Sequence, residues 1–365
     1  MFACMQSKFL PETVFSQKTV VITGGTGSLG KVLTKRILSG KHGMPKKLII
    51  LSRDEAKQHF MRVEYEHLKG TDEVIYNNFK RTLEFRIGDV RDFYSVASAL
   101  RGADLVINAA ALKQVPSCEY FVNEAVQTNV MGAETIVRAI RELSLKIDTV
   151  VGVSTDKACK PVNVMGMTKA LQERVFIGAN VLIPETRFVC VRYGNVLASR
   201  GSVIPLFHDQ IKAGGPVTIT TSDMTRFLLP LERAVDTIIF ALVHAERGET
   251  IVPKVPAANI LDLAKVLIEN KKVEIKITGI RPGEKIHEIM VSDEEAWRTY
   301  AKGDYYAIQA MLPELAGERL PAGTALKKEY SSGDTLMNAQ QIETVLRENK
   351  LMLDQAQTHD GELLR

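Results

Sequence analysis

A glycine-rich stretch near the start of the chain, VVITGGTGSLGK at residues 20–31, limits the fold more than any other segment. It places Gly24, Gly27 and Gly30 directly after an apolar run and at the start of a helical pattern. Glycines in this context let the backbone turn sharply and approach a pyrophosphate, which binds at the positive end of the helix dipole. A structural tight turn is the alternative interpretation. The order strand, loop and helix favours dinucleotide binding, to which we also assign the loop residues Thr26, Ser28 and Leu29.

From residue 18 onward, short apolar runs alternate with longer segments of helical period, which is typical of a parallel sheet with crossover helices. The predicted strands are residues 18–23, 46–52, 83–88, 104–110, 147–154 and 186–192. This pattern predicts an α/β fold, a doubly wound parallel sheet (Rossmann-like) with a smaller α/β lobe that binds substrate. We expect the nucleotide-binding domain at 1–195 plus about 232–253, the smaller lobe at 196–231 plus about 254–340, and a C-terminal tail at 341–365.

The charged residues argue against nucleic acid as a partner. The formal net charge of +4 comes from 47 basic and 43 acidic side chains that are scattered along the chain, without a basic block. The four cysteines form no CxxC pair and no segment has metal-ligand spacing, so we expect no metal and reduced thiols in a cytoplasmic protein. The chain has no apolar run of membrane-spanning length and its N-terminus lacks the apolar core of a signal peptide, which predicts no direct membrane role.

The end of the second strand bears on which dinucleotide binds. In LSRDEAK, Ser52 and Arg53 come first and Lys57 follows one helical turn later. A guanidinium here can clamp a ribose 2′-phosphate, which favours NADP, whereas Asp54 keeps NAD as the alternative because a carboxylate accepts both ribose hydroxyls. After the next two strands, GDVRD and NAAA supply residues that flank the adenine or leave room for a flat cofactor: Asp89, Val90, Ala109, Ala110 and Ala111.

These motifs, together with TNVMGAE around Asn129 and the segment STDKA, resemble the extended short-chain dehydrogenase/reductase family of nucleotide-sugar enzymes. The segments SRDE, ALKQVP, STDKACKPVNVMG, RYGNVLASRGSVIPLF and GIRPGEKIHE are similar to the UDP-N-acetylglucosamine 4,6-dehydratases of the polysaccharide-biosynthesis group. The resemblance covers about residues 15–340. It implies a tightly bound NADP that is recycled in each turnover, UDP-N-acetylglucosamine as the substrate, and a homo-oligomer, either a dimer or a hexamer.

The resemblance assigns the proton transfers to the residues after the fifth strand. Asp156 would protonate the departing C6 oxygen, Lys157 would take the C5 proton, and Thr155 stands beside them. These roles require the pKa of Asp156 to be raised and the pKa of Lys157 to be lowered. In the alternative, Asp156 only caps the following helix and Lys157 is a surface residue.

One position departs from the pattern of the extended family. Most members carry a tyrosine four residues before the lysine that holds the nicotinamide ribose, but here Met165 precedes Lys169. Because a thioether has no exchangeable proton, one interpretation is a protein that binds nucleotide-sugar without turnover. In the other, Lys157 or Asp156 also accepts the C4 proton. Dehydratases that resemble this chain in carrying methionine here invert C5, so the second interpretation implies an inverting enzyme. Asn129 and Lys169 are both expected beside the cofactor.

The resemblance also indicates the substrate contacts. Arg226 and Arg281 suit the pyrophosphate, and the carboxylate of Glu284 suits the two vicinal hydroxyls of the uridine ribose. Further contacts are expected from Lys113, Asn195, Ser202 and Val203. The alternatives are a retaining dehydratase, an enzyme that acts on a GDP-linked sugar, a C4-epimerase, and a nucleotide-sensing regulatory protein.

Overall fold

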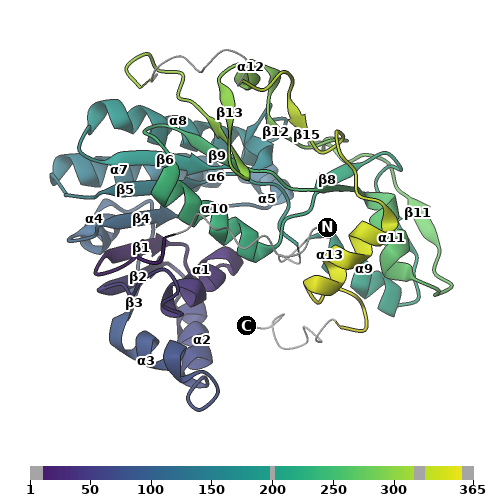
Figure 1. The fold of residues 1–365 in the computed structure, drawn as a ribbon, viewed down its shortest axis with the longest axis horizontal. Helices are drawn as coiled ribbons and strands as arrows, with labels where there is room; N and C mark the ends of the chain where they lie inside the picture. Colours follow the sequence, from purple (N-terminus) through teal and green to yellow (C-terminus); the bar gives the residue numbers. More distant parts are fainter. Residues whose placement is uncertain (1–10, 198–201, 316–324, 356–365) are drawn as a thin grey trace.

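The computed structural model describes residues 11–197, 202–315 and 325–355 (Figure 1). Its centre is a nine-stranded sheet in the order β13-β14-β9-β6-β5-β4-β1-β2-β3. From β9 to β3, neighbouring strands run parallel: β9 (Thr250–Pro253), β6 (Arg187–Val191), β5 (Thr149–Val153), β4 (Leu105–Asn108), β1 (Thr19–Thr23), β2 (Lys47–Ser52) and β3 (Leu83–Ile87). The six strands predicted from the sequence are therefore confirmed, as is the doubly wound α/β fold.

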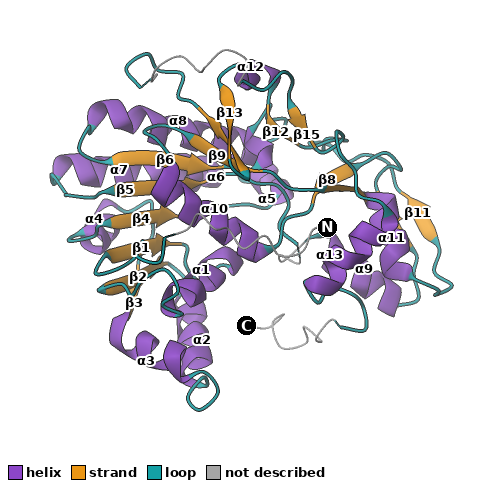
Figure 2. Cartoon of the chain, in the orientation of Figure 1, coloured by secondary structure: helices purple, strands orange, loops and turns teal. Residues whose placement is uncertain are grey.

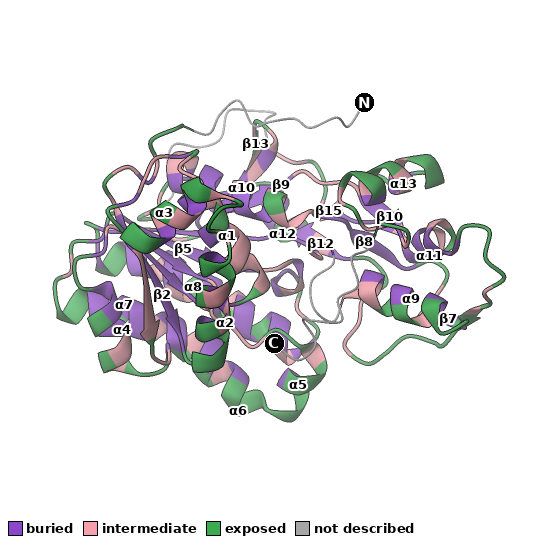
Figure 3. Ribbon diagram, turned by 90° about the horizontal axis from the view of Figure 1, so that it is seen from below, coloured by how far each residue is buried: buried purple, intermediate pink, exposed green. Residues whose placement is uncertain are grey.

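Helices cover both faces of this sheet (Figure 2). One face packs against α1 (Ser28–Leu38), α2 (Glu55–Glu66), α3 (Glu73–Thr82) and α10 (Leu231–His244). The other face packs against α4 (Phe93–Leu100), α7 (Gly132–Glu142) and α8 (Val164–Leu182). Because the central strands are buried on both sides, they are continuous apolar runs: every residue of β1 and β5 is buried, which Figure 3 shows as the interior of the sheet.

Two antiparallel strands, β13 (Thr299–Lys302) and β14 (Tyr305–Ile308), extend the sheet beyond β9. We expected these residues in the smaller lobe, so this part of the predicted domain division is wrong. The reason is packing, because Tyr305 is buried with its ring stacked 4.0 Å from that of Phe240 in α10. An aromatic residue in a short hairpin does not reveal in sequence which of two lobes it packs against.

Within the described residues, the second lobe is built from three helices and three short strand pairs. Its helices are α9 (Val203–Lys212), α11 (Ile260–Ile268) and α13 (Ala339–Glu348). The strand pairs are β7 (Val217–Ile219) with β11 (Ile275–Ile277), β8 (Thr225–Phe227) with β10 (Ala257–Asn259), and β12 (Ile289–Val291) with β15 (Tyr330–Ser331). A separate apolar cluster holds the three helices together, and they lie apart from the main sheet in Figure 1.

Helix α13 corrects our expectation that residues 341–365 form a tail. Ile342 and Leu346 are fully buried in the core of the second lobe, and Met352 after the helix is buried with them. Asn338 caps the helix, and its amide and that of Gln341 satisfy each other's backbone donors. The segment therefore completes the lobe as far as the described residues extend, to position 355.

The remaining short helices lie at the carboxyl edge of the parallel strands. After β4 come α5 (Val115–Tyr120), α6 (Val122–Ala125) and the π-helical segment η1 (Val126–Met131). The 3₁₀ turn η2 (Asp156–Ala158) follows β5, and α12 (Asp293–Ala296) follows β12. In a doubly wound sheet, ligands bind at this edge.

Candidate active site

The glycine-rich loop has the geometry of a phosphate cradle. Gly24 has a φ of +67°, and a Cβ at this position would lie 2.7 Å from the backbone of Ala110. A Cβ at Gly30 would lie 2.4 Å from Gly25 Cα, so the helix can approach the strand only with glycine there. Gly27 caps α1 without a side-chain partner, and the first turn carries no acidic residue. The uncapped helix N-terminus fits the pyrophosphate of a dinucleotide.

The loop is attached to the end of β2 by Thr26, whose hydroxyl lies 2.9 Å from that of Ser52. Both side chains are buried, so in this structure they hold each other. Ser28 and Leu29 begin α1, where the sequence places them.

Some side chains after Ser52 are used within the protein, and others are exposed and could contact a cofactor. Asp54 caps α2 by accepting from Lys57 N at 2.9 Å, and its carboxylate also pairs with Lys57 Nζ at 2.7 Å. The expected cofactor contact from Lys57 is thus already used within the helix. The Arg53 side chain is 55% exposed and lies 3.8 Å from the carboxylate of Asp89. Arg91 holds that carboxylate at 2.7 Å, and these interactions outweigh its burial, so the pKa of Asp89 is lowered.

Two further groups were expected near the cofactor. Ala109, Ala110 and Ala111 are partly buried after β4, and the backbone of Ala109 and Ala110 lies close to Gly24. Asn129 is fully buried in η1, and its amide is occupied by the backbone of Leu112 and by Thr168 Oγ1. Asn129 therefore fixes the loop after β4 to α8. Its expected role as a direct contact is not what this geometry shows.

Asp156 and Lys157 lie together in η2, at the carboxyl end of β5. Asp156 is completely buried, and its Oδ1 accepts from Thr155 Oγ1 at 2.8 Å and from Lys157 Nζ at 3.2 Å. Its other oxygen, Oδ2, is buried without a hydrogen-bond partner among the described residues. The alternative interpretations of this pair, a helix cap and a surface lysine, do not hold. Asp156 caps no helix, and Lys157 is mostly buried. Thr155 is the capping residue of the turn.

Asp156 Oδ2 lies against the end of β6. A Cβ at Gly194 would stand 3.3 Å from this oxygen and 2.7 Å from the side chain of Phe227. Glycine at position 194 is thus what lets β6 pass close to the buried carboxyl group. The glycine in RYGNV carries this signal in the sequence, although the sequence does not show what it approaches.

The structure adds Glu288 to this cluster, a residue that the sequence analysis missed. Its carboxylate is buried, with Oε1 3.3 Å from Lys157 Nζ and 3.6 Å from Arg226 Nε. Arg226 is also buried and donates to the carbonyl oxygens of Thr225 and Ile286. This guanidinium faces Glu288, which differs from the phosphate contact we expected. The segment GEKIHE contains the signal, but residue spacing in a loop does not show which acidic side chain points inward.

The pKa of Asp156 shifts in the predicted direction, whereas the pKa of Lys157 shifts in the opposite direction. Burial raises the pKa of Asp156, and the nearby Glu288 raises it further against the opposing effect of Lys157. The carboxyl group is therefore suited to donate a proton. Burial alone lowers the pKa of Lys157, but Asp156 and Glu288 outweigh it and raise the pKa. The expected lowering of the pKa of Lys157 is wrong because it rested on burial and a nearby cation, whereas two carboxylates face the amine in the structure.

Lys169 and Met165 lie on α8, one turn apart. Lys169 Nζ donates to Val153 O at 2.5 Å and to Gln172 Oε1 at 2.6 Å, and burial lowers its pKa to about 8. Met165 is buried in an apolar cluster with Cys118 and Ala125. The structure thus places a lysine at the end of β5, where the nicotinamide ribose is expected, and no titratable group at position 165.

Several expected substrate residues present unsatisfied polar atoms. Asn195 Oδ1, Ser202 Oγ and Glu284 Oε2 are buried and have no hydrogen-bond partner among the described residues. Ser202 precedes Val203 at the N-terminus of α9, where its hydroxyl makes no capping bond. Buried polar atoms without partners are costly, so these three atoms remain free to accept or donate a hydrogen bond to a polar ligand. Arg281 and Lys113 are exposed.

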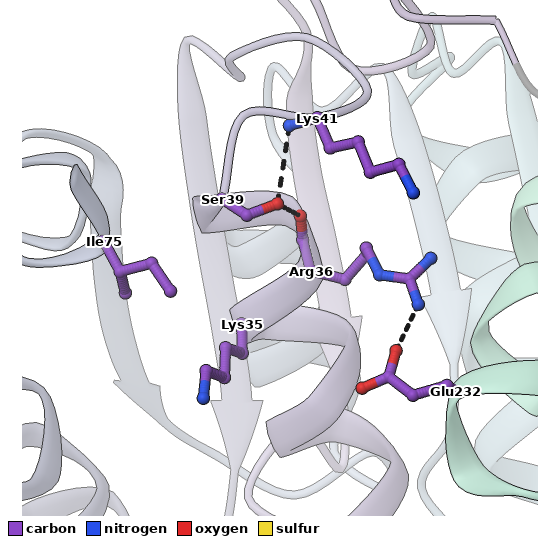
Figure 4. Close-up of a pocket in the computed structure, with 6 residues that line it drawn as sticks. All are labelled: Lys35, Arg36, Ser39, Lys41, Ile75 and Glu232. Carbon is purple, nitrogen blue, oxygen red and sulfur yellow. Dashed lines mark hydrogen bonds and ion pairs between the residues drawn. The ribbon is translucent and has the colours of Figure 1, made fainter. Parts of the chain in front are cut away.

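A pocket at the opposite end of α1 lies away from these residues. It is lined by Lys35, Arg36, Ser39, Lys41, Ile75 and Glu232 (Figure 4). Arg36 pairs with Glu232 and, at 2.7 Å, with Asp236, so it joins α1 to α10. No predicted site residue lines this pocket, and we assign it a structural role.

Within residues 11–197, 202–315 and 325–355, no group of histidine, cysteine and acidic side chains could hold a metal ion. None of the helices described is long and apolar enough to cross a membrane.

The dinucleotide loop, the doubly wound sheet and the lysine on α8 define an enzyme scaffold of the short-chain dehydrogenase/reductase kind. A family model described as "Polysaccharide biosynthesis protein" matches residues 20–310. The chain belongs to this family.

Relatives and solved structures agree with this assignment. A protein of Rickettsia conorii named UDP-glucose 4-epimerase is 42% identical over 346 residues, 91% of this chain and 96% of the relative. One from Rickettsia canadensis with the same name is 46% identical over 300 residues, 81% of this chain and 84% of the relative. The structure of Pen from Bacillus thuringiensis superimposes with a TM-score of 0.82 at 32% identity, covering 93% of this chain and 99% of that one. DesIV, a dTDP-glucose 4,6-dehydratase of Streptomyces venezuelae, shares the fold, with a TM-score of 0.62 at 20% identity over 73% of this chain and 86% of that one.

Proposed function

We propose that this chain is a cytoplasmic, homo-oligomeric, NADP-dependent UDP-N-acetylglucosamine 4,6-dehydratase that inverts C5 and supplies a 4-keto-6-deoxy nucleotide-sugar for surface polysaccharide or glycan synthesis. The observation that carries the proposal is the buried carboxyl group of Asp156, which stands beside Lys157 at the carboxyl end of β5. A 4,6-dehydration expels the C6 hydroxyl, so it needs a proton donor in addition to a base. A C4-epimerisation breaks no C–O bond and has no use for this donor.

The chemistry divides into proton movements that the side chains perform. The bound dinucleotide supplies the acceptor and later the donor of the hydride. Once C4 is a ketone, the C5 proton is acidic, and Lys157 in its neutral form takes it. Asp156 gives its proton to the departing C6 oxygen, which leaves as water while a C5–C6 double bond forms. A hydride then adds to C6 and a proton to C5, and protonation by water from the face opposite Lys157 inverts the centre.

The residues after β2 favour NADP over NAD as the cofactor. Asp54 is used as the cap of α2 and pairs with Lys57, so its carboxylate is not free to accept two ribose hydroxyls. Arg53 keeps more than half of its side chain exposed. This leaves a cation for a 2′-phosphate and no free acid for NAD.

A UDP-glucose 4-epimerase is the second candidate, since the rickettsial relatives at 42% identity carry that name. Both reactions remove the proton of the C4 hydroxyl, and Met165 cannot take it. Lys157 and Asp156 are the groups near β5 that can do so, directly or through water.

The deciding experiment is proton NMR of the purified protein with NADP and UDP-N-acetylglucosamine, and in parallel with UDP-glucose, in deuterated water. A new C6 methyl signal with deuterium at C5 supports the dehydratase, and the ring couplings report inversion or retention. A galacto-type H4 signal without a methyl signal supports the epimerase. If no sugar signal changes for these substrates or for a GDP-sugar, although they raise the melting temperature, a nucleotide-binding regulatory role replaces both. Asp156→Asn is the matched variant and is expected to abolish methyl formation, because it removes the proton donor for the C6 oxygen.

A further inference from the structure

Glu288 reaches Lys157 from the other lobe. It precedes β12, a strand of the second lobe, whereas Lys157 follows β5 of the main sheet. The Glu288 side chain is 3% exposed, and its backbone N–H donates to Ser332 Oγ at 2.9 Å. Only Oε1 is engaged, by Lys157 and Arg226, while Oε2 is buried without a hydrogen-bond partner among the described residues.

The charges that face Lys157 come from three segments, η2, β8 and the loop between β11 and β12. Asp156 is its neighbour in η2, Glu288 lies before β12, Arg226 is in β8, and Lys285 is in the loop between β11 and β12. Lys285 donates to Cys159 O at 2.6 Å and is therefore turned towards η2. The two carboxylates are the nearest groups, at 3.2 and 3.3 Å from Nζ. Coulombic attraction at this distance in a buried site favours the ammonium form.

Asp156 cannot hold Lys157 charged alone. Its burial favours the neutral carboxyl form, and the negative charge of Glu288 adds to that preference. Glu288 adds a second negative charge to that of Asp156, and its own pKa stays low against the effect of burial because Lys157 and Arg226 face it. The two carboxyl groups thus have different tasks, one as proton donor and one as counter-ion.

We propose that Glu288 is a positioning residue for Lys157: its carboxylate holds the ammonium group beside Asp156 and sets the pH above which Lys157 becomes a base. Its effect on turnover rests on the proposed function, but its effect on Lys157 does not. Glu288 and Arg226 both belong to the second lobe. The packing of that lobe against η2 therefore influences whether Lys157 is charged. Glu288 touches Lys157 and acts through it.

The test is the reactivity of the Lys157 amine in the full-length protein. Trace acetylation with acetic anhydride across pH 7–12, quantified on the Lys157 peptide by mass spectrometry, gives the pH at which the amine becomes nucleophilic. In the wild type this midpoint is expected above the ordinary lysine value of about 10.4. In Glu288→Gln it is expected to fall by about one pH unit or more. Glu294→Gln, at an exposed position of α12, is the control and leaves the midpoint unchanged.

A wild-type midpoint at or below the ordinary value overturns the proposal without any variant, so it stays testable even if Glu288→Gln does not fold. An unchanged midpoint in folded Glu288→Gln also overturns it. A kinetic measurement separates the two proposals: the acid limb of kcat/KM for methyl formation should shift to lower pH in Glu288→Gln. The labelling midpoint could fall in Glu288→Gln although neither the wild type nor the variant forms the methyl product. In that case the dehydratase proposal fails and the role of Glu288 stands.

Discussion

Met165 and Lys169 lie one turn apart on α8, and their side chains are buried in environments of opposite polarity. Met165 packs against Cys118 and Ala125, whereas Lys169 Nζ is held by Val153 O and Gln172 Oε1. The pair therefore does not act as a proton-transfer unit. An apolar cluster has replaced the hydroxyl that most extended family members are expected to carry, and the lysine is fixed by the protein itself.

The first prediction concerns this cluster. Met165→Tyr is expected to lower the free energy of unfolding by about 1–3 kcal/mol, because a larger ring must enter a filled apolar site. Its hydroxyl gains no acceptor from Cys118 or Ala125, so turnover should not rise. Met165→Leu is the matched control and is expected to cost less than about 1.5 kcal/mol with turnover retained. Urea denaturation and product NMR measure both, and a tenfold gain in turnover by the tyrosine variant would contradict the prediction.

The second prediction follows from the burial of Lys169, which lowers its pKa to about 8. At pH 9 most of the cofactor-free protein then carries a neutral amine at this position. The phosphates of a dinucleotide favour the ammonium form, so binding at pH 9 should take up as much as about one proton, and binding at pH 7 almost none. Calorimetric titration with NADP in two buffers of different ionisation enthalpy measures this uptake.

Lys169→Met is the control for that titration. It removes the titrating amine, and the proton uptake at pH 9 should vanish even though binding weakens. If uptake at pH 9 is the same in the variant as in the wild type, another group is responsible and Lys169 has the wrong role.

The third prediction tests the choice of cofactor. Arg53→Ala should weaken NADP binding by about tenfold or more, since a charge-assisted contact to phosphate contributes about 1.5–3 kcal/mol. Binding of NAD, which has no 2′-phosphate, should change little. Lys57→Ala is the comparison, because Lys57 is already paired with Asp54 and should affect the two cofactors alike. Equal losses of NADP and NAD in Arg53→Ala contradict the proposed contact.

The strands of the main sheet were predictable because each is a short, continuous apolar run with turn residues at its ends. The glycine loop was predictable for a related reason: the positive φ of Gly24 and its approach to Ala110 leave no alternative to glycine. These are local properties that the sequence carries directly.

The catalytic cluster was predictable only in part. Asp156 and Lys157 are neighbours in sequence, so one motif reveals both, whereas Glu288 is 131 residues beyond Lys157 and meets it only because β12 packs on η2. The wrong sign for the pKa of Lys157 follows from that omission. Likewise, Asn129 and Arg226 are polar residues at plausible positions, but only the fold shows that their polar groups are used inside the protein.

The final prediction concerns a buried ion-pair network, Arg192 with Glu173 and Glu295, that lies next to the strand that leads into the η2 turn. Arg192, at the end of β6, contacts Glu295 at 2.7 Å and Glu173 at 2.6 Å, and Glu173 also accepts from Ser154, next to Thr155. Burial alone raises the pKa of Glu295, but Arg192 outweighs it, and the net effect lowers the pKa from 4.5 to about 2. A carboxyl group with a lowered pKa stabilises the fold above its unfolded-state pKa, and this contribution is lost as the pH falls towards 2.

Glu295→Gln should therefore cost roughly 3 kcal/mol of the free energy of unfolding at pH 7, the energy that corresponds to the lowered pKa. The difference in the free energy of unfolding between variant and wild type should narrow as the pH falls from 4.5 towards 3. In this range the stabilisation from the lowered pKa of Glu295 is progressively lost in the wild type. Urea denaturation at pH 7, 4.5 and 3 measures this, with Glu294→Gln in the same helix as an exposed control whose effect is much smaller. A difference that is constant across this range would mean that packing, and not the charge on Glu295, holds α12 against β6.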